Sequence, residues 1–490
     1  MPGIPRRDAQ RREPEDDTVT RTSIVETFLL VAVAAIVIGV FVARRAADDG
    51  GGEDRANCRG AIGIEVTGLS EAWRTRLAVP AGVTGAVITE VLPDSPASAG
   101  GLRAGDVISA RGAARVTNAC TNEFADGHGC QPFELTIHRG STVLRVRLEP
   151  APAAALFERA CEDGHQSACY RLAWLWSSGS GVPRDEIRAE QVFGTACRAG
   201  NAAACGELGW RWSARAERRA EALPLLGRAC DRGDARGCLL LASAFAMGTL
   251  APRDDVRATP IYEKACALGS ALGCYNTGLM YNEGRGVPQD LGRALRAYAE
   301  GCAMGSTTAC TDEGYMRQHG RGVAEDTALA ASLYERGCAG TPCQVGNLLG
   351  CLNLGKVHRD GIGVAADPAK AAQIFRSACE RPLDPADVNP GPHRARACSL
   401  LGALHLAGRG VPADPAAGLA LSARGCDQGD GFGCFNAGVV FSRGVGVEPD
   451  EERALAFFRR ACGAGDEEAC DHILRRLSEV GDPRAGDGAR

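Results

Sequence analysis

A pair of cysteines with seven residues between them recurs along the C-terminal two thirds of the chain, and this pattern constrains the fold more than any other. Seven pairs have this spacing, two more carry insertions, and successive first cysteines mostly lie 36 residues apart. Such a period predicts a solenoid in which each helix pair packs against its neighbours. The pairs are Cys161 and Cys169, Cys197 and Cys205, Cys230 and Cys238, Cys266 and Cys274, Cys302 and Cys310, Cys426 and Cys434, Cys462 and Cys470, and with insertions Cys338 and Cys351, Cys379 and Cys398.

Each unit repeats one helical pattern. A small residue such as Gly278 stands four positions after the second cysteine and lets a partner helix approach closely. A Gly-rich turn then ends on an acid such as Asp290, which suits a helix N-terminus. The next helix places Ala294, Tyr298 and Cys302 four residues apart, on one face. We therefore interpret the recurring aromatic residues as core packing.

This pattern resembles the Sel-one-like repeat, a relative of the tetratricopeptide repeat, over about residues 152–479. The paired cysteines are most similar to those of bacterial secreted cysteine-rich proteins of the Hcp type. The resemblance implies a mainly α fold, a right-handed α-solenoid of eight units with a half-repeat at each end. Residues 480–490 are expected to form a flexible tail.

The cysteine spacing predicts disulfides. The first cysteine of a pair ends one helix and the second begins the next, so a bond between them closes a short turn and stabilises the fold by about 2–3 kcal/mol. Zinc sites need closer cysteines and four ligands within reach, so neither a metal nor another cofactor is expected. A tenth disulfide, Cys120–Cys130, is predicted before the array. Cys58 and Cys343 are left over, and they either pair together, pair with another chain or leave a free thiol.

An apolar stretch lies near the N-terminus. Residues 24–43 carry a single charge, and about 20 helical residues cover roughly 30 Å, the thickness of a bilayer core. We predict a transmembrane signal-anchor helix over 22–45, a cytoplasmic tail over 1–21 and a polar linker over 46–57. A cleaved signal peptide is the alternative, but a cleavage site needs a small residue where Phe41 stands.

The arginines do not orient this span, because five precede it and four follow it. The cysteines do, because disulfides need an oxidising compartment. We therefore expect a single-pass inner-membrane protein whose N-terminus is cytoplasmic and whose bulk is periplasmic or otherwise extracytoplasmic.

Residues 58–149 consist of short β-rich runs divided by glycines. Within them Val87–Val91 alternates as a strand, a short helix begins near Ala97, and Leu102–Asp106 turns into another strand. Together with Ser95-Pro96-Ala97, these residues resemble the signature of PDZ domains in bacterial HtrA-type proteases. We therefore predict a small PDZ-like domain ahead of the repeats.

In that family a glycine-containing loop before the first strand binds peptides. Its backbone N–H groups converge on a terminal carboxylate, and the strand after it adds the peptide as an extra strand. An arginine at its start would assist through its charge. The alternative is that Ile62 and Ile64 are core residues of a strand that binds nothing. The resemblance assigns the loop to Arg59, Gly60, Ala61, Ile62, Gly63 and Ile64.

The sequence departs from the family over 117–133. In place of the second helix, which forms one wall of the groove, stands a segment where Gly127, Gly129 and Pro132 oppose a long helix. The width and specificity of any groove therefore stay open.

Relatives of the Hcp type are often described as β-lactamases or penicillin-binding proteins. A serine β-lactamase needs Ser-x-x-Lys and Lys-Thr-Gly. None of Lys264, Lys356 and Lys370 has serine three residues before it, and Lys-Thr-Gly is absent. The eight histidines are scattered, with no pair at the spacing of a helical metal site. No catalytic or metal-binding residue is therefore predicted, and enzyme activity is disfavoured.

The first helix of each unit offers better binding candidates, because these helices line the concave face in tetratricopeptide relatives. Asn276, Asn353 and Asn436 recur two positions after the second cysteine. In related repeats an asparagine here holds the backbone of an extended peptide, since its amide both donates and accepts. The alternative is that these side chains bond backbone groups at the helix start.

Two further features stand out in the array. Trp174, Trp176, Trp210 and Trp212 concentrate in its first repeats, where core packing is favoured over an apolar patch for a partner. The Pro-rich insertion 380–397 is predicted to be an exposed loop that interrupts the array.

These features predict a membrane-anchored extracytoplasmic scaffold or adaptor. Its expected ligands are peptides or proteins, including C-terminal tails at the PDZ-like domain. Nucleic acid is not expected, because 55 basic side chains face 60 acidic ones. The alternatives are a cell-wall protein of the Hcp penicillin-binding or β-lactamase-like class, and a component of secretion or envelope assembly, since a single span followed by a PDZ domain is similar to the type II secretion clamp protein.

Overall fold

The computed structural model describes residues 60–62, 64–69, 71–80, 82–112, 114–116, 132–149, 151–339, 346–382 and 390–481. The predicted anchor, its flanking tail and linker, and the leftover cysteines at 58 and 343 lie outside these ranges. None of the described helices combines the length and apolar character needed to cross a bilayer.

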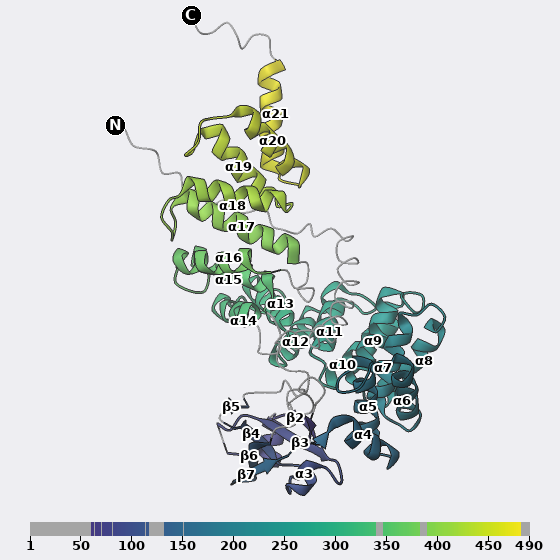
Figure 1. Cartoon of the computed structure of the whole chain (residues 1–490). Helices are drawn as coiled ribbons and strands as arrows, with labels where there is room; N and C mark the ends of the chain where they lie inside the picture. Colours follow the sequence, from purple (N-terminus) through teal and green to yellow (C-terminus); the bar gives the residue numbers. More distant parts are fainter. Residues whose placement is uncertain are drawn as a thin grey trace, which may run out of the picture.

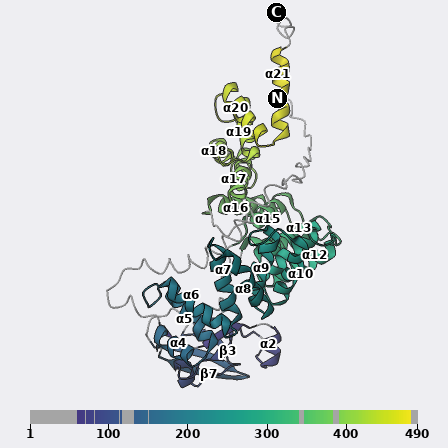
Figure 2. The ribbon, with the colours of Figure 1, turned by 90° about the vertical axis from the view of Figure 1, so that its right-hand side faces the viewer.

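The described part of the chain starts with a small β domain and continues as a long helical array (Figures 1 and 2). The β domain contains β1 (Gly60–Ala61), β2 (Ile64–Gly68), α2 (Glu71–Arg76), β3 (Ala86–Val91), α3 (Pro96–Ala99), β4 (Val107–Arg111), β5 (Ala114–Arg115), β6 (Phe133–Arg139), β7 (Thr142–Leu148) and β8 (Ala151–Pro152).

The array contains α4 (Ala153–Glu162), α5 (Gln166–Ser178), α6 (Glu186–Arg198), α7 (Ala202–Ser213), α8 (Arg219–Asp231), α9 (Ala235–Met247), α10 (Asp255–Ala267), α11 (Ala271–Glu283), α12 (Leu291–Ala303), α13 (Thr307–Gln318), α14 (Thr327–Ala339), α15 (Leu348–Asp360), α16 (Pro368–Glu380), α17 (Pro390–Ala407), α18 (Pro415–Asp427), α19 (Gly431–Arg443), α20 (Glu451–Gly463) and α21 (Glu467–Gly481).

The β domain is an antiparallel sheet in the order β2-β3-β4-β6-β7, with β5 paired to β4. One face of the sheet buries a core that includes Ile62, Ile88, Ile108 and Leu135. The strands and the short helix predicted from the PDZ-like signature are present as β3, β4 and α3.

A buried ion pair closes the turn before β4. The carboxylate of Asp106 is almost fully buried and accepts hydrogen bonds from Arg139 Nε and Nη2, both at 2.7 Å. The same carboxylate accepts the backbone N–H of Arg103 at 2.9 Å. The bond to Asp106 raises the pKa of the Arg139 guanidinium. This pair joins the turn to β6, two parts of the chain far apart in sequence.

The described part of the array is built from eight helix pairs, α5/α6 to α19/α20, with single helices α4 and α21 at its ends. Successive helices lie side by side along the array, which runs from the β domain to α21 (Figure 1). In all but one of these pairs, an aspartate stands directly before the second helix. One example is Asp290, whose side chain accepts a hydrogen bond from the backbone N–H of Arg293 at 2.8 Å. The exception is α8, which begins after Arg218.

In several units the small residue of the first helix packs on the aromatic residue of the second, whereas Gly209 meets Leu226 and Gly402 meets Ser422. Tyr298 is fully buried, and a Cβ added to Gly278 would lie 2.5 Å from its ring. Gly355 is in the same close contact with Phe375. The second helix can approach the first only because no side chain stands between them, so the interpretation of these aromatics as core packing is confirmed.

Nine disulfides within the described residues join the end of one helix pair to the start of the next, with Cα–Cα distances from 4.3 to 4.8 Å. The bonds link Cys161 to Cys169, Cys197 to Cys205, Cys230 to Cys238, Cys266 to Cys274, Cys302 to Cys310, Cys338 to Cys351, Cys379 to Cys398, Cys426 to Cys434 and Cys462 to Cys470. These are the nine pairs that the spacing predicts, and no described cysteine is free. The tenth predicted bond, Cys120–Cys130, lies outside the described residues.

The Pro-rich insertion differs from its prediction. The sequence predicts an exposed loop over 380–397, but α17 begins at Pro390 and runs through Cys398. Proline is compatible with the first turn of a helix, because the N–H groups there have no intrahelical partner. Ala395 and Ala397 are fully buried, so this part of the insertion belongs to the core of the array.

Candidate functional site

The predicted PDZ-like loop is described at Gly60–Ile62 and at Ile64, while Arg59 and Gly63 lie outside the described residues. Ile62 and Ile64 are buried in the core of the sheet domain. The backbone carbonyl of Ile62 accepts the N–H of Ala97 from α3 at 2.9 Å. The part of the loop that the structure shows is therefore held from the sheet side by both apolar packing and a backbone hydrogen bond.

The strand after the loop, β2, pairs with β3 on one side only. Among the described strands it is an edge of the sheet, so its other side offers backbone groups to an added strand. The opposite wall of a PDZ groove falls within 117–131, which the structure does not describe.

The three asparagines predicted to bind peptides occupy one position in three first helices, α11, α15 and α19. Each side chain is half-buried, and those of Asn276 and Asn353 form no hydrogen bond with another described residue. The Nδ2 atom of Asn436 is buried and has no partner among the described residues. Among the described residues, these amides thus make no hydrogen bond to backbone groups at the helix start.

Asp312 extends this row, because it stands two positions after the second cysteine of the repeat between those of Asn276 and Asn353. Burial raises the pKa of its carboxyl to about 7; the charge of Glu283 adds to the rise and that of Arg321 opposes it. A search for recurring asparagine does not find this residue. A search by position, two residues after the second cysteine of each repeat and without regard to residue type, would have found it.

Glu207 holds the same position in α7 but is fully paired. Its carboxylate accepts hydrogen bonds from Arg211 Nε at 2.8 Å and from Arg236 Nη1 at 2.9 Å. Arg211 also donates a hydrogen bond from Nη1 to Glu186 at 2.7 Å. The Glu207 side chain is completely buried. This network joins three consecutive repeats and gives Glu207 a structural role.

The four tryptophans are half-buried and pack within the array. Trp174 meets Phe193 edge-on at 6.2 Å, and the guanidinium of Arg211 lies 5.5 Å from the Trp174 ring. Arg218 lies 3.7 Å from the ring of Trp212, which also donates to Glu190. These contacts agree with core packing as the main role of the tryptophans.

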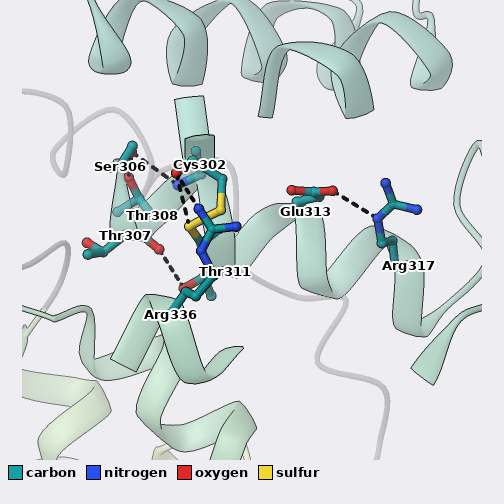
Figure 3. The surroundings of a disulfide bond; sticks show 10 residues. Cys302, Ser306, Thr307, Thr308, Thr311, Glu313, Arg317 and Arg336 are labelled. Carbon is teal, nitrogen blue, oxygen red and sulfur yellow. Dashed lines mark hydrogen bonds and ion pairs between the residues drawn. A yellow bond between two sulfur atoms is a disulfide. The ribbon is translucent and has the colours of Figure 1, made fainter. Parts of the chain in front are cut away.

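Arginines bind the disulfide edge of neighbouring repeats. Figure 3 shows Arg336 of α14 beside the sulfur–sulfur bond of Cys302. Its Nη2 atom donates a hydrogen bond to the carbonyl oxygen of Cys302 at 2.8 Å. Arg232 makes the same contact with Cys197 at 2.8 Å, and Arg424 with Cys379 at 3.3 Å. A cation suits the C-terminal end of a helix, where carbonyls lack intrahelical partners.

One group of described residues has the composition of a metal site: Cys266, Cys274 and Glu300. Its two sulfurs are bonded to each other, however, so neither is a thiolate that could bind a metal ion. We assign this group to the disulfide framework.

Comparison with protein families gives two matches. The PDZ domain family matches residues 54–123. The Sel1 repeat family matches eight segments that together make up more than half of the chain, 143–165, 166–201, 235–270, 271–306, 309–341, 348–382, 395–430 and 431–466. The segment 202–234 is not among the matches, yet it folds as the helix pair α7/α8 like the others.

Several solved structures are similar to this chain, and no curated protein matches it. A Sel1 repeat protein from Oxalobacter formigenes is 22% identical over 66% of this chain and 89% of its own, with a TM-score of 0.47. Cysteine rich protein B of Helicobacter pylori is 26% identical over 26% of this chain and 93% of its own, with a TM-score of 0.23. The HtrA-type protease AlgW, solved with a decapeptide, is 26% identical over 19% of this chain and 29% of its own, with a TM-score of 0.18. Because the Sel1 repeat model matches more than half of the chain, the chain belongs to the Sel1 repeat family, with a PDZ domain ahead of its repeats.

Proposed function

We propose that this protein is a membrane-anchored extracytoplasmic scaffold that binds extended peptide segments of other proteins. The observation that carries the proposal is the combination of two interaction modules in one chain, a PDZ domain and a Sel1 array. Each offers unpaired backbone or amide groups to a ligand. Together they suit a protein that holds partners rather than one that transforms them.

At the PDZ domain, the ligand is a peptide with a free C-terminal carboxylate. The side of β2 that no described strand pairs with supports this, because an edge strand presents alternating N–H and C=O groups that an extended peptide can pair with. The loop at 59–64 would take the carboxylate, with Arg59 adding charge.

Along the array, the ligand is an extended segment that crosses several first helices. Asn276, Asp312 and Asn353 support this, because they present an amide, a carboxyl and an amide from one position of three consecutive repeats. Such a row matches the alternating donors and acceptors of a peptide backbone. The rigid disulfide edge would keep the row in register.

The extracytoplasmic location is supported by the nine disulfides, because the cytosol keeps thiols reduced. The predicted span would then tether the protein to the inner membrane, with the PDZ domain nearest to it. Cysteine accessibility in whole cells, with a membrane-impermeant maleimide at engineered positions on each side of the span, would show the orientation.

Crosslinking in intact cells tests the binding function. The wild-type chain is compared with a variant that carries Asn276→Ala, Asp312→Ala and Asn353→Ala. The control carries Arg296→Ala, Ser332→Ala and Gln373→Ala, three exposed residues that share one position in the second helices of the same repeats. We expect the first variant, and not the control, to lose crosslinked partners identified by mass spectrometry. Equal recovery from both would reject the row as a binding surface.

A further inference from the structure

The described part of the PDZ loop lies on the boundary between the β domain and the array. Its first strand, β1, does not join the main sheet but pairs antiparallel with β8, with Gly60 opposite Pro152 and Ala61 opposite Ala151. β8 leads directly into α4, the first helix of the array. The start of the loop is thus paired with the start of the array.

Successive loop residues face two different cores. Ile62 packs in the core of the sheet, whereas Ala61 is only 1% exposed and packs in a second cluster with residues of the array. The second cluster also takes in Leu92, which directly follows β3, and it contains Leu156 and Phe157 of α4. If either the sheet core or the second cluster were disrupted, only one of these two packing contacts would hold the loop in place.

Polar contacts join the same two parts of the molecule. Ser167 of α5 donates from Oγ to the carboxylate of Glu90 on β3 at 2.9 Å. His165, at the start of α5, places Nδ1 3.9 Å from the other oxygen of Glu90. The first two helices of the array, α4 and α5, therefore contact the β domain at β1 and at β3, the strand that pairs with β2.

We propose that the first helix of the array, α4, is a positioning element of the PDZ loop, so that packing of α4 against Ala61 and binding of a peptide carboxylate at the loop are coupled. The proposal rests on the function proposed above and adds to it a role for the array. Backbone N–H groups bind a carboxylate only when they converge on one point, and here α4 fixes one end of the loop that carries them. A ligand that orders the loop will in turn stabilise α4.

Hydrogen exchange on the full chain in mild detergent tests the coupling without a ligand. Leu156→Ala removes the α4 side of the second cluster. Leu333→Ala is the matched control, because Leu333 is also 3% exposed and stands at the same position of its repeat, five residues before the first cysteine. We expect Leu156→Ala to speed amide exchange at 60–64 at least tenfold, and Leu333→Ala to leave it unchanged. Faster exchange in α4 alone, with the loop protected as in the wild type, would overturn the proposal.

Peptide binding tests the consequence. The probe is a pool of fluorescein-labelled hexapeptides of mixed sequence with a free C-terminal carboxylate, and its amidated counterpart is the control. We expect Leu156→Ala to weaken binding of the carboxylate pool at least fivefold, Leu156→Met to restore it, and Leu333→Ala to leave it unchanged. Equal binding by the wild type and Leu156→Ala would overturn the coupling. A wild-type chain that binds neither pool would refute peptide binding at the loop, and the exchange experiment would then decide the structural coupling alone.

Discussion

The β domain and the repeat array are stabilised in opposite ways. The β domain joins segments distant in sequence, as when Arg139 on β6 reaches back to Asp106 before β4, and its described residues contain no cysteine. In the array, contacts mostly join helices of one repeat or of adjacent repeats, and a disulfide joins every two successive units of its described part. A destabilising substitution in the β domain therefore lowers the stability of the whole domain, whereas one in the array lowers the stability only of nearby repeats.

This contrast bears on function, because a scaffold needs a rigid surface more than a large core. Most repeats bury one or two aromatic residues and a few alanines, whereas α7/α8 and α17/α18 bury leucines instead. The covalent edge adds stability that so small a core does not provide. The predicted PDZ loop lies where the two kinds of structure meet, and its described residues contact both.

Reduction of the disulfides should have the largest effect and should separate the two regions. Each bond that closes a short interval, such as Cys230–Cys238, contributes about 2–3 kcal/mol, so their loss destabilises the whole array. We expect the helical circular dichroism signal to melt at a much lower temperature in tris(2-carboxyethyl)phosphine, while amides of β3 and β4 keep their protection from exchange. Simultaneous loss of protection in both regions would show that the β domain depends on the array for its own fold.

Arg139→Ala should cause the next largest loss of stability, and this loss should fall on the β domain and not on the array. It leaves the buried carboxylate of Asp106 without its partner, which costs about 3–5 kcal/mol. Arg145→Ala on β7 is the control, because that side chain is 75% exposed and its ion pair with Glu134 is long, at 3.8 Å. We expect exchange to rise throughout the β domain in Arg139→Ala only, with α9 to α20 unaffected. Exchange confined to the turn at 102–106 would contradict a cooperative β domain.

Gly278→Ala should have a smaller, local effect. The added methyl group meets the ring of Tyr298 at 2.5 Å, and overpacking of this kind costs about 1–3 kcal/mol. Gly227→Ala in α8 is the control, because nothing lies within 4 Å of the added group and alanine is the better helix former by about 1 kcal/mol. We expect urea denaturation and exchange to show loosening of α11 to α13 in the first variant and slight stabilisation in the second. Loss of structure along the whole array would show that its repeats are not independent.

Much of the fold could be predicted because the array is local. The positions of Gly278 and Tyr298 relative to their cysteines are enough to place two helices, their shared face and the disulfide between units. The prediction of a loop over the whole insertion is wrong for a physical reason: proline content indicates a loop only away from the first turn of a helix, and Pro390 stands at that turn.

The candidate site could be predicted less well, because it depends on contacts between distant segments. Nothing in the sequence of Gly60–Ala61 indicates pairing with Ala151–Pro152, since both are short and carry no side-chain pattern. The pKa of Asp312 depends likewise on Glu283 and Arg321, which belong to two different repeats. Patterns of residue type along the chain cannot supply such distances.

Asp312 gives the smallest prediction, and it asks whether the array carries function as well as structure. Because the pKa of this carboxyl is about 7 in the folded chain and 3.8 in its reference state, the folded chain holds a proton between these values that the unfolded chain has released. Stability should therefore fall as the pH rises from about 4 to 7, by about 1–2 kcal/mol, since water screens a half-buried charge. Asp312→Asn should abolish this loss, measured as the urea midpoint at pH 5 and pH 8. Asp231→Asn is the control, because that carboxylate is 83% exposed. If the pH dependence of stability is the same in Asp312→Asn as in the wild type, the pKa of this carboxyl is not raised by folding. The row of Asn276, Asp312 and Asn353 would then lack the raised pKa that sets it apart from a purely structural surface.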